Sequence, residues 1–316
     1  MTAFVLRRVV QSIPLLLLIS VFAFTLIRLA PGGVISNYED PLMTEADIER
    51  LEEALGLHEP LPVQYGKWLS TVLRGDLGKS FSTREPVLGM ILDRLPATLE
   101  LTTIALAIGL LVGIPLGVLS ALRPGSRFDS AVRVLTVAGS AVPHWWLGLL
   151  AIVLFAGVLH ILPSAGRFTI GRPFDLLDHL RYLLLPALIL STGPIIAFSR
   201  FVRAEVREVL SAEFVRTAES KGLSLHAVMR SHVLRNALIP LVTLLGLSLP
   251  GLFSGAALTE IVFSWPGLGQ MALAMATRRD LPVLMGLIMI SSFLVVLGNL
   301  LADLLYGVID PRVRYS

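Results

Sequence analysis

Long runs without an acidic or basic residue alternate with polar segments along most of the chain. The first run covers Val9–Ile27. Five more follow, at Leu101–Leu122, Val134–Leu159, Tyr182–Ser199, Asn236–Thr259 and Leu281–Ala302. A helix needs about 20 apolar residues to cross the hydrocarbon core of a bilayer. Because a helix satisfies its own backbone hydrogen bonds in lipid, the pattern predicts an all-α polytopic membrane protein with six transmembrane helices.

The polar segments divide the chain into three parts. Residues 1–30 form an N-terminal tail and the first transmembrane helix, and residues 99–316 form a core of five helices. Between them lies the long segment 31–98, in which "TEADIERLEEALGL" and "PVQYGKWLSTVLRG" have the charge pattern of short amphipathic helices. This segment is either a docking shelf for a soluble partner or a solvated loop that serves only packing.

Basic residues set the predicted orientation. Lys and Arg concentrate in the tail, in two of the short loops and at the C-terminus, at residues 7–8, 123–133, 200–235 and 312–314. The opposite short loops hold fewer: Arg167, Arg172, Arg181, Arg278 and Arg279. Loops rich in Lys and Arg stay in the cytoplasm, so both termini are predicted to be cytoplasmic and segment 31–98 extracytoplasmic.

One cytoplasmic loop carries a helical pattern of its own, "EFVRTAESKGLSLHAVMRSHVLRNALIP", residues 213–240. Phe214 and Ala218 share one face of its first half. In its second half, apolar positions recur at helical spacing from Leu225 onward. Gly222 separates the halves as a helix stop would. The pattern predicts two short helices joined at Gly222, either lying on the membrane surface or fitting a groove on a cytosolic protein.

Composition agrees with a membrane protein and offers no catalytic chemistry. The chain has 316 residues, is 54% hydrophobic and only 16% charged, has a net charge of +3 and contains no Cys. "GDLGKS" ends like a phosphate-binding loop, but Leu73 stands where that motif requires Gly. The six His show no metal-ligand spacing. We therefore expect no catalytic, cofactor-binding or metal-binding residue on this chain.

Several segments resemble the permease subunits of ABC importers. In "EFVRTAESKGLS", Arg216-Thr217-Ala218 stands where the EAA signature has E-A-A, and Gly222 is the motif glycine. Arg216 departs from the usual Glu in the form common to the dipeptide/oligopeptide/nickel branch. Other stretches resemble the same branch and its B-type subunit, at residues 94–122, 140–156, 259–270 and 299–315.

The resemblance implies a type I ABC importer permease fold in a bacterial or archaeal cytoplasmic membrane. It also implies a second permease subunit of the C-type, two cytosolic ATPase subunits that hold ATP and Mg²⁺, an extracytoplasmic solute-binding protein, and no nucleic acid. The coupling helix would be residues 213–222. Its residues at the ATPase would be Glu213, Phe214, Arg216, Thr217, Ala218, Lys221 and Gly222.

Two further groups are candidates for roles in transport. Candidates for lining or gating the translocation path are Pro143, Gly246, Ser248, Gly251, Ser254 and Glu260. Candidates for docking the binding protein are Trp265, Gly267 and Gln270. Di- or oligopeptides are the expected substrate, with a nickel chelate or an oligosaccharide as alternatives within the branch. A secondary transporter or channel subunit is the alternative from a different class.

Overall fold

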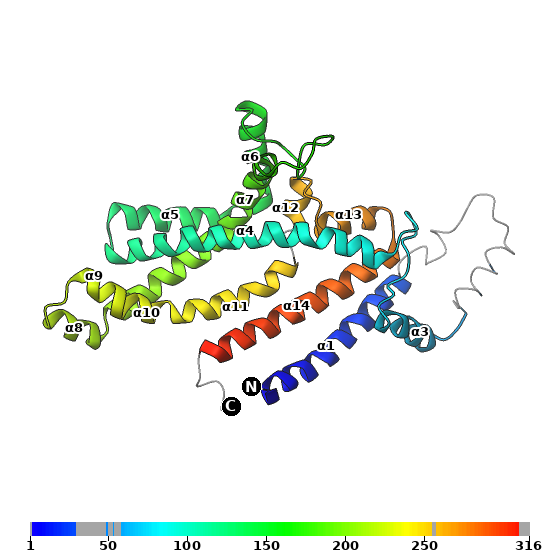
Figure 1. Cartoon of the computed structure of the whole chain (residues 1–316), viewed down its shortest axis with the longest axis horizontal. Coiled ribbons are helices and arrows are strands. Elements are labelled where there is room, and N and C mark those ends of the chain that lie inside the picture. Colours follow the sequence, from blue (N-terminus) through cyan, green and yellow to red (C-terminus); the bar gives the residue numbers. More distant parts are fainter. Residues whose placement is uncertain (1, 30–48, 50–52, 54–57, 255–256, 310–316) are drawn as a thin grey trace.

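The computed structural model describes residues 2–29, 49, 53, 58–254 and 257–309, and the regular structure of these residues is helical apart from one antiparallel bridge between Lys79 and Pro86. The helical elements, as labelled in Figure 1, are α1 (Thr2–Leu29), α3 (Leu61–Leu73), α4 (Val87–Leu122), α5 (Arg127–Ala141), α6 (His144–Ala151), η2 (Ile152–Val158), α7 (Leu176–Leu210), α8 (Glu213–Ser220), α9 (Leu225–Val228), η3 (Met229–Val233), α10 (Leu234–Ala237), α11 (Ile239–Ser254), α12 (Ala257–Val262), α13 (Leu268–Thr277) and α14 (Leu281–Ile309).

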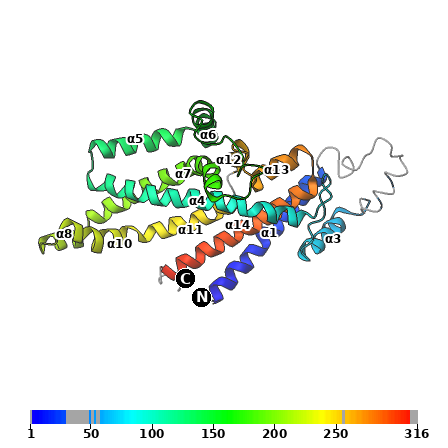
Figure 2. The same cartoon turned by 45° about the horizontal axis from the view of Figure 1, so that its top comes forward.

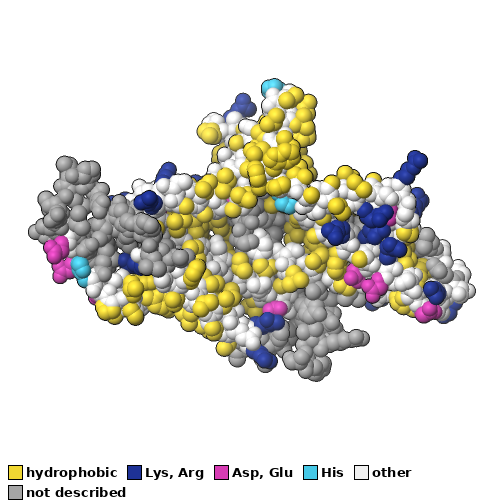
Figure 3. Space-filling view, turned by 180° about the vertical axis from the view of Figure 1, so that it is seen from behind, with side chains coloured by type: hydrophobic (Ala, Val, Ile, Leu, Met, Phe, Trp, Pro, Cys, Tyr) yellow, Lys and Arg dark blue, Asp and Glu magenta, His cyan; other side chains and the backbone are white. Residues whose placement is uncertain are grey.

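The long helices lie in two layers. Helices α4 and α7 pack along each other in one layer, and α14 packs between α11 and α1 in the other (Figures 1 and 2). Helix α5 turns back alongside α4 and α7, whereas α6 and η2 project away from the bundle (Figures 1 and 2). Hydrophobic side chains cover much of the bundle surface, and Lys and Arg gather toward the end that holds α5 and α8 (Figure 3).

The α4–α7 contact depends on three glycines of α4. A methyl group at Gly109 would lie 2.3 Å from Cβ of Pro194, and one at Gly117 would lie 2.7 Å from the carbonyl oxygen of Ser199. A methyl group at Gly113, which lies between them, would be 3.0 Å from the carbonyl oxygen of Ile195. Small residues let membrane helices approach this closely, so these three glycines allow α4 to pack directly on α7.

The predicted spans are only partly found as single helices. Segments Arg7–Thr25, Val87–Leu122, Leu176–Leu210 and Leu281–Leu304 are long and apolar enough to cross a membrane. The predicted span Val134–Leu159 is wrong as one helix. It is broken into α5 and α6, which meet at 98°, because Pro143 cannot continue a helix from Val142. The count of six spans and the orientation of the termini remain predictions.

Of the two amphipathic helices predicted in segment 31–98, one falls within the described residues. Helix α3 confirms the second, and the first lies outside the described residues. Helix α3 packs on α1 through aromatic side chains, with the ring centroids of Phe24 and Tyr65 5.6 Å apart. The hydroxyls of Ser20 and Tyr65 lie 2.7 Å apart. At its other end, α1 is tied to α14 by Arg8 and Asp303, 3.2 Å apart.

Candidate functional site

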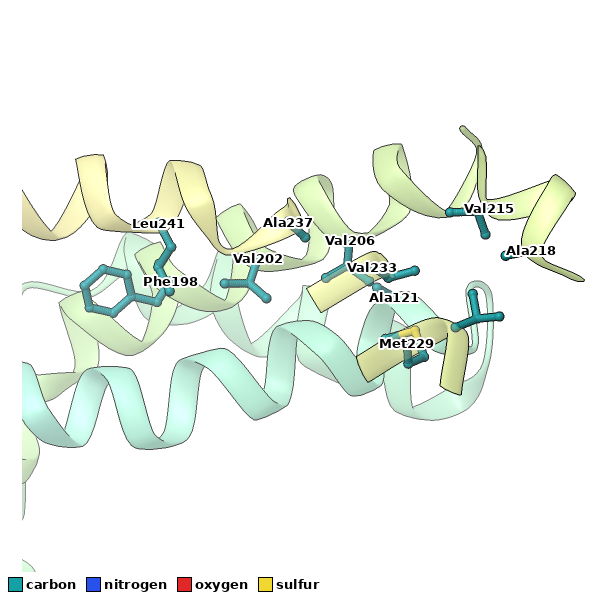
Figure 4. Close-up of a cluster of buried hydrophobic side chains, with 11 residues drawn as sticks. Ala121, Phe198, Val202, Val206, Val215, Ala218, Met229, Val233, Ala237 and Leu241 are labelled. Carbon is teal, nitrogen blue, oxygen red and sulfur yellow. The ribbon is translucent and has the colours of Figure 1, made fainter. Parts of the chain in front are cut away.

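Residues 213–240, here called the elbow, begin with the eight-residue helix α8. Val215 and Ala218 are 1% and 5% exposed and join Val206 of α7 in one buried apolar cluster (Figure 4). The sequence placed Phe214 on the same face as Ala218, but Phe214 is 46% exposed. The buried face is centred between Val215 and Ala218, so Phe214 lies beside it and points outward.

The polar side chains of α8 are exposed. Arg216 and Glu213 form an ion pair at 3.1 Å, and the hydroxyl of Thr217 donates to the carbonyl of Glu213 at 2.9 Å. Lys221, just beyond the helix, is exposed as well. Of the residues predicted to contact an ATPase, all except Ala218 therefore present an exposed surface.

Gly222 ends the first half of the elbow as the sequence predicts. Its φ is +83°, a conformation that costs a residue with a Cβ about 1 kcal/mol or more, while nothing lies within 4 Å of a methyl group built there. The N–H of Leu223 donates back to the carbonyl of Ala218 at 3.4 Å. The glycine is thus required by the turn of the backbone and not by crowding.

The second half of the elbow contains a π-helical turn. Element η3 separates α9 from α10, and its Met229 and Val233 are buried in the same cluster as Val215 and Ala218. Short π-helical turns inside α-helices are rare and are frequent at functional sites. The sequence pattern predicted a helix here but carried no signal for its wider turn. Through α10 the elbow continues directly into α11.

A buried ion pair that the sequence reasoning missed anchors the helices beside the elbow. Asp129 of α5 is 1% exposed and accepts hydrogen bonds from Arg203 of α7 at 2.6 and 3.0 Å. The hydroxyl of Ser120 at the end of α4 donates to the same carboxylate at 2.5 Å. One feature of the sequence could have indicated this acid: Ser126, the N-cap of α5, stands three residues before Asp129 and accepts from its backbone N–H.

At the other end of the molecule, α12 and α13 form a tight turn, residues 257–277, here called the hook. Glu260 of α12 is fully buried, and its carboxylate accepts from the hydroxyl of Thr98 at 2.7 Å. It also accepts from the backbone N–H groups of Gly269 and Gln270, at 2.7 and 3.2 Å. The first turn of α13 thus holds the carboxylate, which suits the positive end of a helix.

The turn between α12 and α13 has no room for a side chain at Gly267. A methyl group there would lie 2.2 Å from the Glu260 carboxylate. Trp265, in the same turn, is fully buried and donates its indole N–H to the carbonyl of Ala97 on α4, at 2.8 Å. The hook is therefore fastened to α4 through two polar side chains.

A second polar cluster lies beside the hook. Glu100 of α4 contacts Arg167 and His179, each at 2.5 Å, and the guanidinium carbon of Arg167 lies 5.6 Å from the ring of Trp265. The remaining nitrogen of His179 lies 2.9 Å from the carbonyl of Arg167. Glu100 directly precedes the uncharged run Leu101–Leu122, but the sequence did not indicate its partners, which lie 67 and 79 positions away.

Asp280, between α13 and α14, clamps the loop that leads into α4. It is fully buried, and it accepts hydrogen bonds from the hydroxyls of Ser80 and Ser82 and from the backbone N–H groups of Phe81 and Ser82, at 2.6 to 3.1 Å. Burial alone would raise the pKa of Asp280, but these hydrogen bonds together lower it below its ordinary value.

A cavity of about 290 Å³ lies between α4, α7 and α11. Two of the residues predicted for the translocation path line it, Ser248 and Gly251. Gly246 instead packs against Ala302 of α14. The lining is mostly apolar and consists of Thr102, Ala105, Leu106, Leu190, Gly193, Pro194, Ala197, Phe198, Leu244, Ser248 and Gly251.

Family models match almost the entire chain. Residues 113–315 match the binding-protein-dependent transport system inner membrane component, and residues 1–102 match the N-terminal membrane component of such systems. The chain belongs to this family of transport permeases. It is therefore a membrane-integral transport component.

Relatives and solved structures agree with this assignment. The permease is 39% identical to the oligopeptide transport system permease protein AppB of Bacillus subtilis (strain 168), and 40% identical to a putative peptide transport system permease protein of Brucella abortus (strain 2308), each over 100% of both chains. Its fold is similar to that of the inward-facing MetNI methionine ABC transporter, with a TM-score of 0.56 at 19% identity over 72% of this chain and 99% of that chain.

The structure distributes the remaining predicted site residues of the permease over separate places. Pro143 stands at the break between α5 and α6, and Glu260 lies in the hook on α12. The side chain of Ser254 lies outside the described residues. Trp265 and Gly267 are buried within the hook, and Gln270 is half-buried. Their roles in the translocation path and in docking remain predictions.

Proposed function

We propose that this permease is the B-type translocating subunit of an ATP-driven importer of di- or oligopeptides in a bacterial or archaeal cytoplasmic membrane. The peptide permeases that match it over their full length support this substrate class. Its partners would be a C-type permease, two ATPase subunits that bind ATP and Mg²⁺, and a solute-binding protein. The nearly continuous match to a family defined by binding-protein-dependent transport supports that assembly.

The exposed face of α8 is the observation that carries the coupling part of the proposal. Val215 and Ala218 fix the helix on α7, while Phe214, Arg216 and Lys221 point outward. Such a helix can enter a groove on an ATPase and move the bundle as a rigid body. In this proposal, ATP binding draws the elbow inward, α10 and α11 follow, and the hook end opens toward the binding protein.

Arg216→Glu tests the coupling role. The side chain is exposed, so the substitution should leave the thermal midpoint of the purified protein within about 2 °C. Charge reversal at a contact with a partner should lower peptide uptake and binding-protein-stimulated ATP hydrolysis by about tenfold in the reconstituted importer. We expect both rates to fall together, because one contact transmits both.

Arg230→Glu is the matched control, since Arg230 is also an exposed elbow arginine but lies on η3. It should retain both rates. Equal rates in all three proteins would remove α8 from the coupling mechanism. If the unsubstituted assembly hydrolyses ATP but imports no peptide, the substrate assignment is wrong and the coupling role of α8 is judged from ATP hydrolysis alone.

A further inference from the structure

A second cavity, of about 320 Å³, lies where the C-terminal end of α1 meets α3 and the first turns of α14 (Figure 1). Its wall carries two cations, Arg28 at the end of α1 and Lys79 in the loop after α3, and one acid, Asp76. Most of the remaining wall is apolar and includes Phe24 and Trp68. The cavity therefore combines an excess of positive charge with apolar surface.

The ends of two apolar segments place this cavity at the depth of lipid headgroups. The segment of α1 that is long enough to cross a membrane ends at Thr25, and Arg28 stands three residues beyond it. The corresponding segment of α14 begins at Leu281, which lines the same cavity. The ring centroids of Phe24 and Trp68 lie 5.7 Å apart, and Trp side chains are enriched where a membrane meets water.

Arg28 reaches the cavity without an anionic partner in the part of the chain that the structure describes. Its side chain is half-buried, and its guanidinium carbon lies over the ring of Phe24, 5.3 Å from the ring centroid. A contact of this kind uses the flat face of the guanidinium and leaves the N–H groups at its edge to an acceptor. Phosphate oxygens match this planar fork, and such charge-assisted bonds are about twice as strong as neutral ones.

The loop that supplies the second cation is the segment "GDLGKS", residues 75–80. It cannot hold a nucleotide as a phosphate-binding loop does, because the hydroxyl that would bind Mg²⁺ belongs to Ser80, which is buried and donates to Asp280 at 2.6 Å. Asp76 accepts from the backbone N–H of Gly78 at 2.8 Å, which fixes the turn before Lys79. Lys79 is exposed and forms no ion pair with a described residue.

The position of the cavity in the bundle favours a lipid over the transported solute. Among the described residues, its wall includes none from α4, α7 or α11, the three helices that line the cavity of about 290 Å³. Helix α14 packs between α11 and α1, and the cationic cavity is formed with α1. A ligand of this cavity therefore approaches along α1 and α14 and does not pass between α4 and α7.

An apolar hollow adjoins the cationic cavity. It has a volume of about 270 Å³, lies between α1 and α3, and shares Phe24 with that cavity. Its hydroxyl groups already have partners, because Thr25 donates to the carbonyl of Val21 at 2.8 Å and the hydroxyl of Tyr65 lies 2.7 Å from that of Ser20. The hollow thus suits a hydrocarbon chain next to a site for an anion.

We propose that Arg28 and Lys79 bind the phosphate of an anionic phospholipid whose headgroup enters the cavity between α1, α3 and α14, with an acyl chain in the adjoining hollow. The wall carries one more cation than acids, which favours an anionic headgroup such as phosphatidylglycerol. The bound lipid fastens α3 and α14 to the end of α1. The inference does not depend on which solute the permease transports.

Native mass spectrometry of the full-length permease in detergent tests this site with three probes. These are dioleoylphosphatidylglycerol, dioleoylglycerol, which has the same chains without phosphate, and sn-glycerol 3-phosphate, which has the phosphate without chains. Arg28→Gln and Lys79→Gln should each bind the first phosphatidylglycerol about tenfold more weakly, the effect of one charge-assisted hydrogen bond. Binding of dioleoylglycerol should not change. The thermal midpoint without added lipid should stay within about 2 °C for Lys79→Gln, because this side chain is exposed.

Arg74→Gln is the matched control, because Arg74 is exposed at the end of α3 but does not line the cavity. It should bind phosphatidylglycerol as tightly as the unsubstituted protein does. An equal loss in all three variants would mean diffuse attraction between basic side chains and an anionic lipid, and the site would be wrong. Unchanged binding in both Arg28→Gln and Lys79→Gln would overturn it as well. If sn-glycerol 3-phosphate binds as tightly as the phospholipid, the ligand is a soluble phosphate and the lipid assignment is wrong.

Discussion

The elbow and the hook, at opposite ends of the permease, are built in opposite ways. The polar groups of α8 in the elbow are exposed and bond mostly within their own helix, while apolar side chains hold that helix in place. In the hook the carboxylate of Glu260 is fully buried, and it joins α12, α13 and α4. Each turn requires a glycine, Gly222 for its positive φ and Gly267 for lack of space.

Because of this difference, the surface of α8 can exchange its polar partners, whereas the buried groups of the hook cannot. An exposed ion pair contributes about 0–1 kcal/mol, so α8 can give up the bond between Arg216 and Glu213 to bind another protein. When a buried carboxylate is removed, the groups that donated hydrogen bonds to it are left without a partner. Each unsatisfied buried donor costs about 1–3 kcal/mol. The hook should therefore move as one piece with α4, and the elbow should be the adaptable end.

The largest predicted effect is that of Glu260→Ala. It removes the acceptor of Thr98, Gly269 and Gln270 inside the fold, so we expect a loss of about 3 kcal/mol or more in the free energy of unfolding. Thermal and chemical unfolding of the purified permease in detergent would measure it. Phe214→Ala on the exposed face of α8 is the contrasting variant and should change stability by less than about 0.5 kcal/mol.

Equal stability of the Glu260→Ala and Phe214→Ala proteins would contradict the contrast between hook and elbow. Glu260→Gln sharpens the test, because an amide keeps one acceptor oxygen. We expect Glu260→Gln to lose less free energy of unfolding than Glu260→Ala, because its remaining oxygen still accepts. Some loss remains, because the amide NH₂ group replaces the other oxygen and faces hydrogen-bond donors.

The elbow was predictable from sequence because its determinants are local. The spacing of its apolar residues and the helix stop at Gly222 act within one segment, and both are found in the structure. The exposed position of Phe214 was not predicted, because periodicity defines a face only to within about one residue of its centre.

The hydrogen bonds of Glu260 in the hook and of Asp280 could not be predicted in the same way, because the partners of these two acids are distant in sequence. Thr98 lies 162 residues from Glu260, and Ser80 lies 200 residues from Asp280. A pattern along the chain shows that an acid stands near a span end, but it does not show which donors the fold brings to it. The break at Pro143 had a local signal, which the length of the uncharged run obscured.

A smaller, pH-dependent effect is predicted for Asp280. Its pKa in the folded protein is lowered, so its carboxylate stabilises the fold above the ordinary value of about 3.9, and this contribution is lost as the pH falls through the lowered pKa. At pH 7, Asp280→Asn should lower the free energy of unfolding by about 1–2 kcal/mol, because the loop at Ser80 and Ser82 loses acceptors.

The difference between the unsubstituted protein and Asp280→Asn should shrink as the pH falls below about 4, since protonation and the amide remove the same negative charge. Thermal midpoints across this range would measure it, with limited proteolysis of residues 74–86 as a local readout. A difference that stays constant down to pH 3 would show that the charge of Asp280 does not hold the loop.

The smallest effect is predicted for Glu213→Gln on α8. Both partners of the ion pair with Arg216 are mostly exposed, with side-chain exposures of 87% and 66%, so its loss should change the free energy of unfolding by less than about 0.5 kcal/mol. Under the proposed coupling role, transport can still change, because Arg216 would then enter the ATPase groove without its intramolecular partner. A stability loss as large as that of Asp280→Asn would mean that the elbow, like the hook, is a joint held by its polar groups, and the distinction between the two ends would fail.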